Sequence, residues 1–199
     1  NNIEGLIAML KSTDKKDLAD EVFQKIEQSV SKVRHTIDQI SSVVKIQRTE
    51  EQDVGEVSFD KVLAEVLEEN VNMVAAAKPQ IIRDFAIDSI HFSHTTLKSI
   101  MYNLVTNALK YRSTERDLEI QLRTFSKENH IYLSVEDNGL GIDLKQNKDK
   151  LFSIFSRFHD HVEGSGIGLF MVKRLVEKRG GNISVASEEN KGTTFTVKF

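Results

Sequence analysis

Glycines gather near a carboxylate between residues 137 and 168. Asp137 opens the motif Asp-Asn-Gly-Leu-Gly directly after an alternating apolar run, and the motif Gly-Ser-Gly-Ile-Gly of residues 164–168 runs into a segment with helical periodicity. Glycine lets the main chain turn sharply or approach a ligand closely. Unpaired N–H groups at a helix start favour an anion such as phosphate. The stretch alone fits a phosphate-binding loop and a simple turn equally well, and a lone glycine cluster is more often a turn.

Two common glycine motifs do not fit this stretch. A dinucleotide fingerprint needs Gly-x-Gly-x-x-Gly directly after a strand, whereas the spacing here is Gly-x-Gly-x-Gly. A P-loop needs Gly-Lys-Ser or Gly-Lys-Thr, and the chain contains neither triplet. The stretch is therefore another kind of nucleotide loop, or only a turn.

A second set of polar residues lies in the segment His94–Tyr111, whose apolar residues follow the helical period. Asn103 and Asn107 are four residues apart and Lys110 is three further on, so all three share one helix face. A carboxamide oxygen can ligate Mg²⁺, and a lysine one turn away can reach the phosphates that the cation bridges. From this helix alone, a solvated polar edge is the favoured alternative.

Strand and helix patterns alternate from Glu56 onward and position these motifs. Ile131, Leu133 and Val135 alternate along a strand that delivers Asp137 at its end, where ligands tend to bind. The other expected strands are Glu56–Phe59, Gln80–Ala86, His91–Phe92, Asp117–Phe125, Asn182–Ala186 and Thr193–Phe199, and a further helix is expected over Ile167–Lys178.

The N-terminal part reads as a helix, a turn and a longer helix, roughly Leu18–Arg48. The longer helix carries a heptad seam typical of a coiled coil, formed by Phe23, Ile26, Val30, Val33, Ile37, Ile40 and Val44. The first helix is much shorter than its partner, so on the order of 20 residues are expected before Asn1. We expect a hairpin over residues 1–52, a domain boundary near residues 49–55 and a second domain over 53–199. A homodimeric four-helix bundle is the preferred packing, and a hairpin packed on its own domain is the alternative.

Composition limits the classes of function. The chain of 199 residues has 30 acidic and 27 basic residues and a net charge of −3, so we expect no nucleic-acid partner. The absence of cysteine excludes disulfides and thiolate metal sites. No apolar run approaches the ~20 residues that cross a bilayer. We expect a cytoplasmic location for this segment, with a parent protein that could be membrane-anchored.

Four motifs in chain order resemble the catalytic domain of sensor histidine kinases: the asparagine helix, the Asp-x-Gly-x-Gly turn, a phenylalanine-rich segment and the Gly-x-Gly-x-Gly helix start. That domain has the Bergerat ATP-binding fold shared with gyrase-type, heat-shock-chaperone-type and mismatch-repair-type ATPases. The heptad hairpin resembles the dimerisation and phosphotransfer hairpin of the same kinases. The resemblance implies an α+β fold, a two-layer α/β sandwich with a mixed sheet, preceded by a long α-helical hairpin.

The resemblance also implies roles for single residues. Asn107 corresponds to the Mg²⁺ ligand, Lys110 and Arg112 to phosphate contacts, Tyr111 to a side wall of the adenine site, and Asp137 to the acceptor of the adenine amino group. Residues 157–163 correspond to a mobile lid, and Thr194 to a threonine that helps to fix the aspartate. The full set expected to bind ATP is Asn103, Asn107, Lys110, Tyr111, Arg112, Asp137, Gly139, Gly141, Ile142, Phe152, Phe155, Arg157, Gly164, Ser165, Gly166, Ile167, Gly168, Leu169 and Thr194.

Position 103 separates two activities within this wider family. The gyrase-type and chaperone-type enzymes have a glutamate four residues before the metal-binding asparagine, and this glutamate prepares a water for attack. Asn103 stands there in this chain, and an amide cannot accept a proton. A neutral imidazole is already a competent nucleophile, so the substitution favours phosphoryl transfer to histidine. An ATPase or a non-catalytic nucleotide-binding scaffold remains the alternative.

The phosphoacceptor histidine of such kinases lies in a His-Asp/Glu-x-x-x-Pro motif, which this chain lacks. We expect it upstream of Asn1, with a response-regulator receiver domain as the next phosphate acceptor. His35 lacks the motif and is interpreted as a surface histidine. The pairs His91 with His94 and His159 with His161 lack a third ligand at fixed spacing, so we expect no zinc site.

Overall fold

The structure is a computed structural model that describes residues 22–23, 25–26, 29–30, 53–147, 150–156 and 166–199. The chain divides into two units, residues 1–49 and 50–199. The described residues of the first unit, Val22, Phe23, Lys25, Ile26, Ser29 and Val30, are all helical. The rest of the predicted hairpin, including His35, lies outside the described residues.

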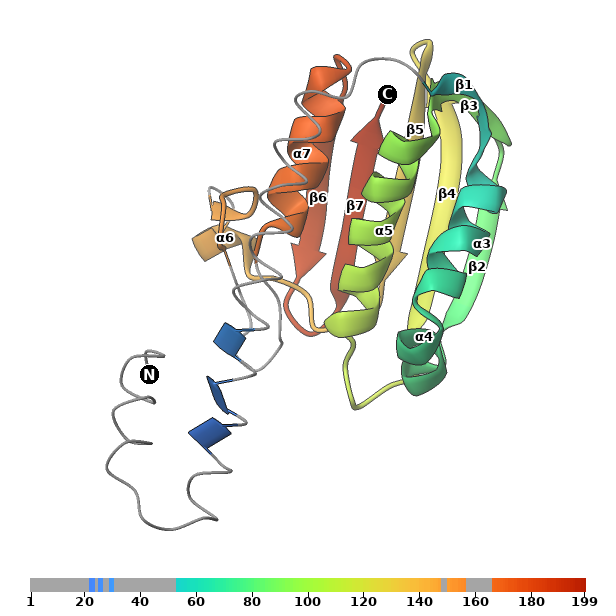
Figure 1. The fold of residues 1–199 in the computed structure, drawn as a ribbon. Helices are drawn as coiled ribbons and strands as arrows, with labels where there is room; N and C mark the ends of the chain where they lie inside the picture. Colours follow the sequence, from blue (N-terminus) through green and yellow to red (C-terminus); the bar gives the residue numbers. More distant parts are fainter. Residues whose placement is uncertain (1–21, 24, 27–28, 31–52, 148–149, 157–165) are drawn as a thin grey trace. The chain divides into compact units, whose positions relative to one another are not determined.

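The second unit is built on a mixed five-stranded sheet with the order β2-β4-β5-β7-β6 (Figure 1). Strand β2 runs parallel to β4, and all other neighbours are antiparallel. This mixed pairing confirms the predicted sheet. The strands are β2 (Gln80–Phe85), β4 (Glu119–Lys127), β5 (His130–Asp137), β6 (Asn182–Glu188) and β7 (Gly192–Lys198).

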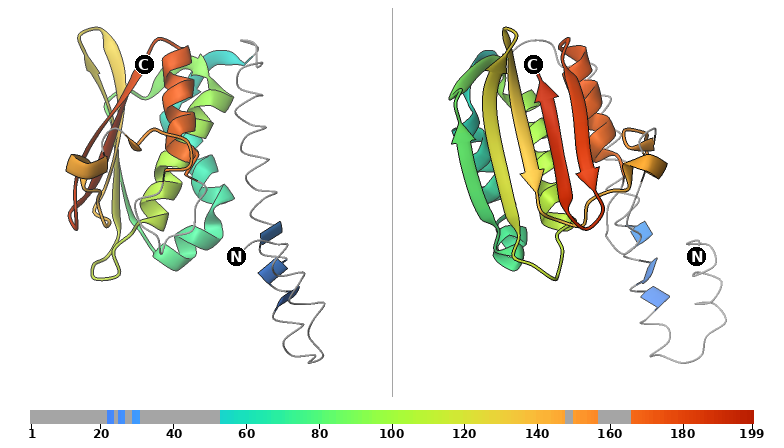
Figure 2. Two further views of the ribbon diagram at one scale, coloured as in Figure 1. Left: turned by 90° about the vertical axis from the view of Figure 1, so that its left-hand side faces the viewer. Right: turned by 180° about the vertical axis from the view of Figure 1, so that it is seen from behind.

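Helices cover one face of this sheet, which gives the predicted two-layer α+β arrangement. Figure 2 shows the three longest helices of this unit on the same face: α3 (Phe59–Glu69), α5 (His94–Lys110) and α7 (Gly168–Lys178). Two short helices, α4 (Val71–Ala77) and α6 (Leu144–Asn147), complete the set of described helices here. Strands β1 (Val54–Ser58) and β3 (Ser89–Ser93) form a separate antiparallel pair.

The core lies between the sheet and the three helices. Alternate residues of β4 are buried, namely Ile120, Leu122 and Thr124, because successive side chains of a strand point to opposite faces. In the central strand β5 the consecutive residues Leu133, Ser134 and Val135 are all buried. Helix α5 buries its apolar stripe, Leu97, Ile100, Met101, Leu104, Val105, Ala108 and Leu109. The helical period read from the sequence therefore corresponds to the face of α5 that packs on the sheet.

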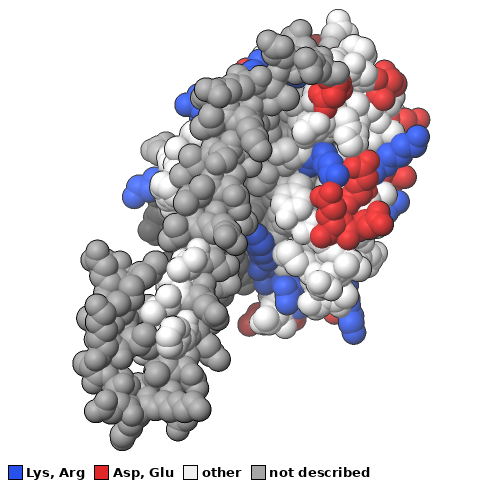
Figure 3. All heavy atoms as spheres, in the orientation of Figure 1, with Lys and Arg blue, Asp and Glu red and all other residues white. Residues whose placement is uncertain are grey.

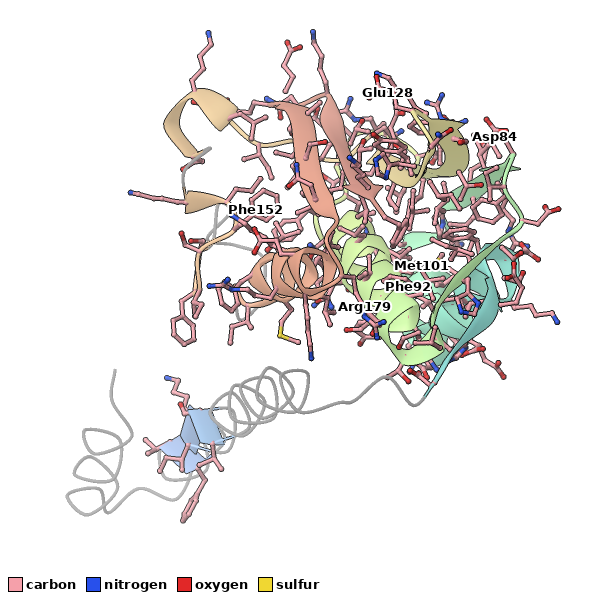
Figure 4. All side chains as sticks on the ribbon, turned by 90° about the horizontal axis from the view of Figure 1, so that it is seen from above. Asp84, Phe92, Met101, Glu128, Phe152 and Arg179 are labelled. Atoms are coloured by element: carbon pink, nitrogen blue, oxygen red, sulfur yellow. The ribbon has the colours of Figure 1, made fainter. Side chains whose placement is uncertain are left out.

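Aromatic rings close the end of the core where the chain terminates. The Phe92 ring meets the Phe199 ring edge to face, with centroids 5.1 Å apart, and Phe199 lies 6.2 Å from Phe59. The Arg179 guanidinium lies over the Phe92 ring at 5.5 Å (Figure 4), a distance typical of a cation–π contact. These contacts attach the β1–β3 pair to the main sheet and to the end of α7.

Helix α5 begins at a well-capped N-terminus. The Ser93 hydroxyl accepts a hydrogen bond from the Thr96 N–H (3.1 Å), and an Asp53 carboxylate oxygen accepts one from the Thr95 N–H (2.9 Å). The hydroxyls of Thr95 and Ser93 lower the pKa of Asp53 from 3.8 to about 2. Two of the N–H groups that a helix start leaves unpaired are thereby satisfied. This fixes the start of the helix that carries Asn103 and Asn107.

Charges of both signs lie side by side over α3 and α5 (Figure 3). The Lys98 ammonium lies 3.0 Å from a Glu65 oxygen and 2.8 Å from a Glu69 oxygen, and His94 lies 3.0 Å from Glu65. The two glutamates raise the pKa of Lys98. The Lys98 charge therefore offsets part of the negative charge of the two glutamates.

Candidate functional site

Asp137 is the last residue of β5, as the alternating strand pattern predicted, and β5 lies between β4 and β7 in the sheet. The Asp137 carboxylate accepts a hydrogen bond from the Gly139 N–H (2.8 Å) and another from the Thr193 N–H. Burial nevertheless raises the pKa of Asp137 from 3.8 to about 6, and nearby Glu136 adds to the rise. No cation among the described residues offsets this effect. The site therefore holds a carboxylate that is short of favourable partners.

The turn after Asp137 is held against the end of α5. The Leu140 N–H donates to the Tyr111 carbonyl oxygen (2.8 Å). A Cβ on Gly139 would lie 2.4 Å from the same oxygen, so only glycine permits this approach. Asn138 fixes the other side, since its amide accepts from the Glu119 N–H (3.0 Å) and donates to the carbonyl of residue 117 (2.9 Å). The end of α5 at Tyr111 is thus brought against the turn that follows Asp137.

The second half of the turn lies on the β6–β7 hairpin. Gly141 has a positive φ of 68°, and a Cβ there would lie 2.0 Å from the Glu188 carbonyl oxygen. The Asn190 N–H donates to the Leu140 carbonyl (2.6 Å), and the Ile142 N–H donates to the Ser187 hydroxyl (2.8 Å). The turn that follows Asp137 is therefore held on the hairpin by a backbone hydrogen bond at Leu140 and by the Ser187 hydroxyl at Ile142.

The two asparagines of α5 have different surroundings, although both are half-buried. The Asn103 amide donates to the Ser99 carbonyl (2.8 Å), and its oxygen would lie 2.6 Å from a Cβ on Gly168. Asn103 thus fills the contact between α5 and the start of α7. Among the described residues, none forms a hydrogen bond with the Asn107 side chain. The Asn107 amide oxygen is thus available to a ligand.

The basic residues at the end of α5 also differ. The ammonium of Lys110 is crowded by protein atoms although much of the side chain is exposed, and this burial lowers its pKa. No acidic partner of Lys110 is found in the part of the chain that the structure describes. Arg112 donates to the Leu109 carbonyl (3.0 Å). Of the two predicted phosphate contacts, Lys110 has the less compensated charge.

The phenylalanine-rich segment and the start of α7 meet at one point. Gly166 has a φ of 70°, and a Cβ there would lie 2.6 Å from the Phe155 carbonyl carbon. Phe155 itself has a positive φ and is 58% exposed. The Lys173 ammonium of α7 lies 5.6 Å from the centroid of the half-buried Phe152 ring (Figure 4). The contact at Gly166 therefore joins described residues on either side of the predicted lid.

The remaining predicted residues of this part are placed as follows. Ile167 is buried, and Gly168 and Leu169 form the first turn of α7 and are half-buried. Arg157, Gly164, Ser165 and the predicted lid over residues 157–163 lie outside the described residues.

The structure shifts the predicted role of Thr194 by one residue. In the β5–β7 register, Asp137 lies opposite Thr193, whereas Thr194 lies opposite Glu136. Neighbouring strand residues point to opposite faces, so Thr194 faces away from the Asp137 side. Thr193 is buried and donates its N–H to the Asp137 carboxylate. Thr193 is therefore the threonine that holds Asp137.

Three residues near Asp137 were missed from the sequence: Asn138, Ser187 and Thr193. For Thr193 a signal existed, because it alternates in phase with the apolar Phe195 and therefore belongs to the core face. Asn138 and Ser187 act through contacts with segments distant along the chain, which no local pattern reveals.

Two further predictions concern metals and membranes. No group of three or more His, Cys, Asp or Glu that could hold a metal ion is found within the described ranges. None of the helices searched in these ranges is long and apolar enough for a membrane span.

Comparison with known proteins gives consistent matches. The family described as histidine kinase-, DNA gyrase B- and HSP90-like ATPase matches residues 93–199. The sensor protein RprX of Bacteroides fragilis is 37% identical over 105 residues, 51% of this chain and 20% of RprX. The aerobic respiration control sensor protein ArcB of Escherichia coli is 28% identical over an alignment of 209 residues, 99% of this chain and 26% of ArcB. The solved histidine kinase AdeS of Acinetobacter baumannii has a TM-score of 0.73 at 17% identity, covering 99% of this chain and 92% of that chain.

The fold and the site thus define an ATP-binding domain of the Bergerat type. The chain belongs to the histidine kinase-, DNA gyrase B- and HSP90-like ATPase family. The similar proteins include the sensor proteins RprX and ArcB, and the fold is that of the histidine kinase AdeS, in agreement with the predicted family of sensor histidine kinases. The chain spans about a fifth to a quarter of the length of RprX and ArcB.

Proposed function

We propose that this chain binds Mg-ATP and belongs to a dimeric sensor histidine kinase. Residues 53–199 form the catalytic domain, and residues 1–52 belong to a hairpin for dimerisation and phosphotransfer. The γ-phosphoryl group passes to a histidine outside this chain, on the upstream helix, and then to an aspartate of a response-regulator receiver domain. The family assignment and the sensor-kinase relatives support this proposal.

The main support for the proposal is the environment of the Asp137 carboxylate. This carboxylate is half-buried, desolvation raises its pKa to about 6, and it accepts hydrogen bonds from two backbone N–H groups beside glycines that admit no side chain. A desolvated acceptor of this kind is satisfied by a ligand that donates a hydrogen bond. The 6-amino group of adenine is such a donor.

The phosphate end of the site is assigned to α5. Asn107 offers an amide oxygen, which suits a hard cation that takes most of its ligands from phosphate and water. Lys110 offers an ammonium without an anionic partner among the described residues. Asn107 would hold Mg²⁺ there, and the cation would supply positive charge to the phosphates. Asn107 and Lys110 then orient the triphosphate, and catalysis consists mainly of positioning.

The surroundings of Asn103 favour transfer over hydrolysis. Its amide is committed to the Ser99 carbonyl and to the contact with Gly168. The Asn103 amide cannot accept a proton from a water molecule, and these contacts prevent it from moving toward a water molecule. An incoming neutral imidazole needs no such base.

The described part of the first unit agrees with a dimeric hairpin. Phe23 and Val30, two positions of the heptad seam, are 52% and 50% exposed, while the neighbouring Val22 is buried. An apolar seam of this kind gains free energy when a second hairpin covers it. The proposed partner at the seam is a second copy of the chain.

Calorimetry on residues 1–199 tests the nucleotide site. We expect binding of ATP in excess Mg²⁺, and loss of binding in the variants Asp137→Asn and Asn107→Ala. Lys127→Ala, an exposed position at the tip of the β4–β5 hairpin, serves as the control and should bind as the unmodified chain does. Absence of heat from ATP with the unmodified chain would refute the proposal.

Phosphoryl transfer needs a longer protein that includes the upstream helix. After incubation with γ-radiolabelled ATP, we expect a phosphorylated protein whose label is acid-labile and base-stable, as a phosphohistidine is. Asp137→Asn should abolish the label and His35→Ala should not. Binding of ATP without labelling would favour a non-catalytic scaffold. Steady hydrolysis by the isolated chain that is lost in Asn107→Ala would favour an ATPase.

A further inference from the structure

Ser187 connects the two segments that hold the Asp137 carboxylate. One N–H donor to that carboxylate comes from Gly139 in the turn, and the other comes from Thr193 at the start of β7. The Ser187 hydroxyl accepts the Ile142 N–H at the end of the turn (2.8 Å) and donates to the Gly192 carbonyl (2.8 Å). It also lies 2.9 Å from the Thr193 hydroxyl.

The hydrogen-bonding capacity of Ser187 is fully used by these contacts. A hydroxyl has one donor hydrogen and two lone pairs. The hydrogen goes to Gly192, so the two lone pairs receive the Ile142 N–H and the Thr193 O–H. This assignment fixes the direction of the Thr193 hydroxyl hydrogen and leaves the lone pairs of the Thr193 oxygen free.

The backbone around Ser187 leaves little room for adjustment. A Cβ on Gly192 would lie 1.9 Å from the Asp137 carbonyl oxygen, and one on Gly141 would lie 2.0 Å from the Glu188 carbonyl oxygen. The turn and the hairpin are therefore in direct contact on both sides of Ser187. A side chain that links such closely packed segments can set their relative position to a few tenths of an ångström.

We propose that Ser187 is a positioning residue for base recognition: its hydroxyl aligns the turn and Thr193 so that the Asp137 carboxylate meets the amino group of adenine. The inference rests on the proposed function, because it concerns the same nucleotide site. Ser187 does not touch the base itself. It acts through Thr193, Ile142 and Gly192.

The test measures base preference rather than affinity alone. ATP and purine riboside triphosphate, which lacks only the 6-amino group, are titrated by calorimetry in excess Mg²⁺. The ratio of the two dissociation constants isolates the contact with Asp137, because the phosphate contacts are common to both ligands. We expect Ser187→Ala to lower the preference for ATP about 5- to 10-fold, the equivalent of one hydrogen bond. Ser187→Thr, which keeps the hydroxyl, should restore the preference.

Two further variants separate positioning from a general loss of folding. Ser184→Ala removes an exposed hydroxyl from the same strand and should leave the preference unchanged. Thr193→Val removes the hydroxyl but keeps the N–H that binds Asp137. Ser187 acts partly through that hydroxyl. The double variant Ser187→Ala with Thr193→Val should therefore lose less of the preference for ATP than the sum of the losses in the two single variants. Thermal melting of each variant verifies that it is folded.

The possible results distinguish this inference from the proposed function. Equal weakening of both nucleotides in Ser187→Ala, or an unchanged ratio, would overturn the positioning role while ATP binding stands. Failure of the unmodified chain to bind ATP would overturn the proposed function, and the inference with it.

Discussion

Replacing Asp137 with asparagine should stabilise the ligand-free protein. Burial raises the pKa of Asp137 from 3.8 to about 6, so the folded state holds the proton more tightly than the unfolded chain does. Above pH 6 the ionised carboxylate therefore costs folding free energy. The rise in pKa corresponds to a cost of at most about 3 kcal/mol in folding free energy, since each unit of pKa difference is worth about 1.4 kcal/mol. The side chain keeps some contact with water, so about 1–2 kcal/mol is the expected gain.

The pH dependence gives this prediction its sign. The cost is fully present above the folded pKa of about 6 and absent below the ordinary value of 3.8. At pH 8 the melting temperature of Asp137→Asn should exceed that of the unmodified chain by about 3–6 °C, taking roughly 3 °C per kcal/mol for a domain of this size. Below pH 4 the two should melt together. Excess Mg-ATP at pH 8 should reverse the order, because only the unmodified chain is stabilised by binding.

Thermal unfolding followed by circular dichroism, without nucleotide, provides the measurement. Asp84 is an exposed carboxylate on β2 (Figure 4), and Asp84→Asn is the matched control, with an expected change below about 0.5 kcal/mol. A variant Asp137→Asn that melts below the unmodified chain at pH 8 would refute the reasoning. It would mean that the hydrogen bonds from Gly139 and Thr193 outweigh the cost of burial. A difference that persists below pH 4 would exclude ionisation as its cause.

Three further changes test the elements around the site. Gly141→Ala should lower the free energy of unfolding by about 2 kcal/mol or more in urea titrations, because a Cβ at this positive φ would meet the hairpin backbone. The control Gly55→Ala should cost under about 1 kcal/mol, because a Cβ on Gly55 would meet no atom within 4 Å. Lys110→Met should leave the melting temperature unchanged or higher and weaken ATP binding about 10-fold by calorimetry, with Lys127→Met as the unaffected control. Asp53→Ala should cost about 1 kcal/mol at pH 7, and urea titrations should show this cost shrinking between pH 4 and pH 2, because the pKa of Asp53 is lowered to about 2.

The elements that carry the site could be predicted because their patterns are local. The apolar stripe of α5 fixes which face packs on the sheet, and this places Asn103 and Asn107 on its flank. The alternation of Leu133 and Val135 defines β5 and leaves Asp137 at its end. Each pattern is repeated over two or more periods, so an error at one residue does not change the assignment.

Contacts between distant segments could not be predicted in this way. The pairing of Asp137 with Thr193 depends on strand register, and a change of one residue places Thr194 on the other face. The pKa of Asp137 depends on burial by surrounding segments, and Ser187 acts on a residue 45 positions away. Strand alternation places Thr193 on the core face, but no periodic signal gives its pairing with Asp137 or the contacts of Ser187. They follow only from the packed fold.

The two ends of the site share an unfavourable feature that one ligand can relieve. Asp137 holds a half-buried negative charge that two N–H groups only partly offset, and Lys110 holds a crowded positive charge without an anionic partner among the described residues. Natural sequences tend to keep such local conflicts at functional positions. A hydrogen-bond donor at the first end and an anion at the second end would satisfy both. Adenosine triphosphate carries both groups, with its amino group on the base and its charge on the phosphates, so the unfavourable features of the free protein indicate the same ligand as the order of motifs does.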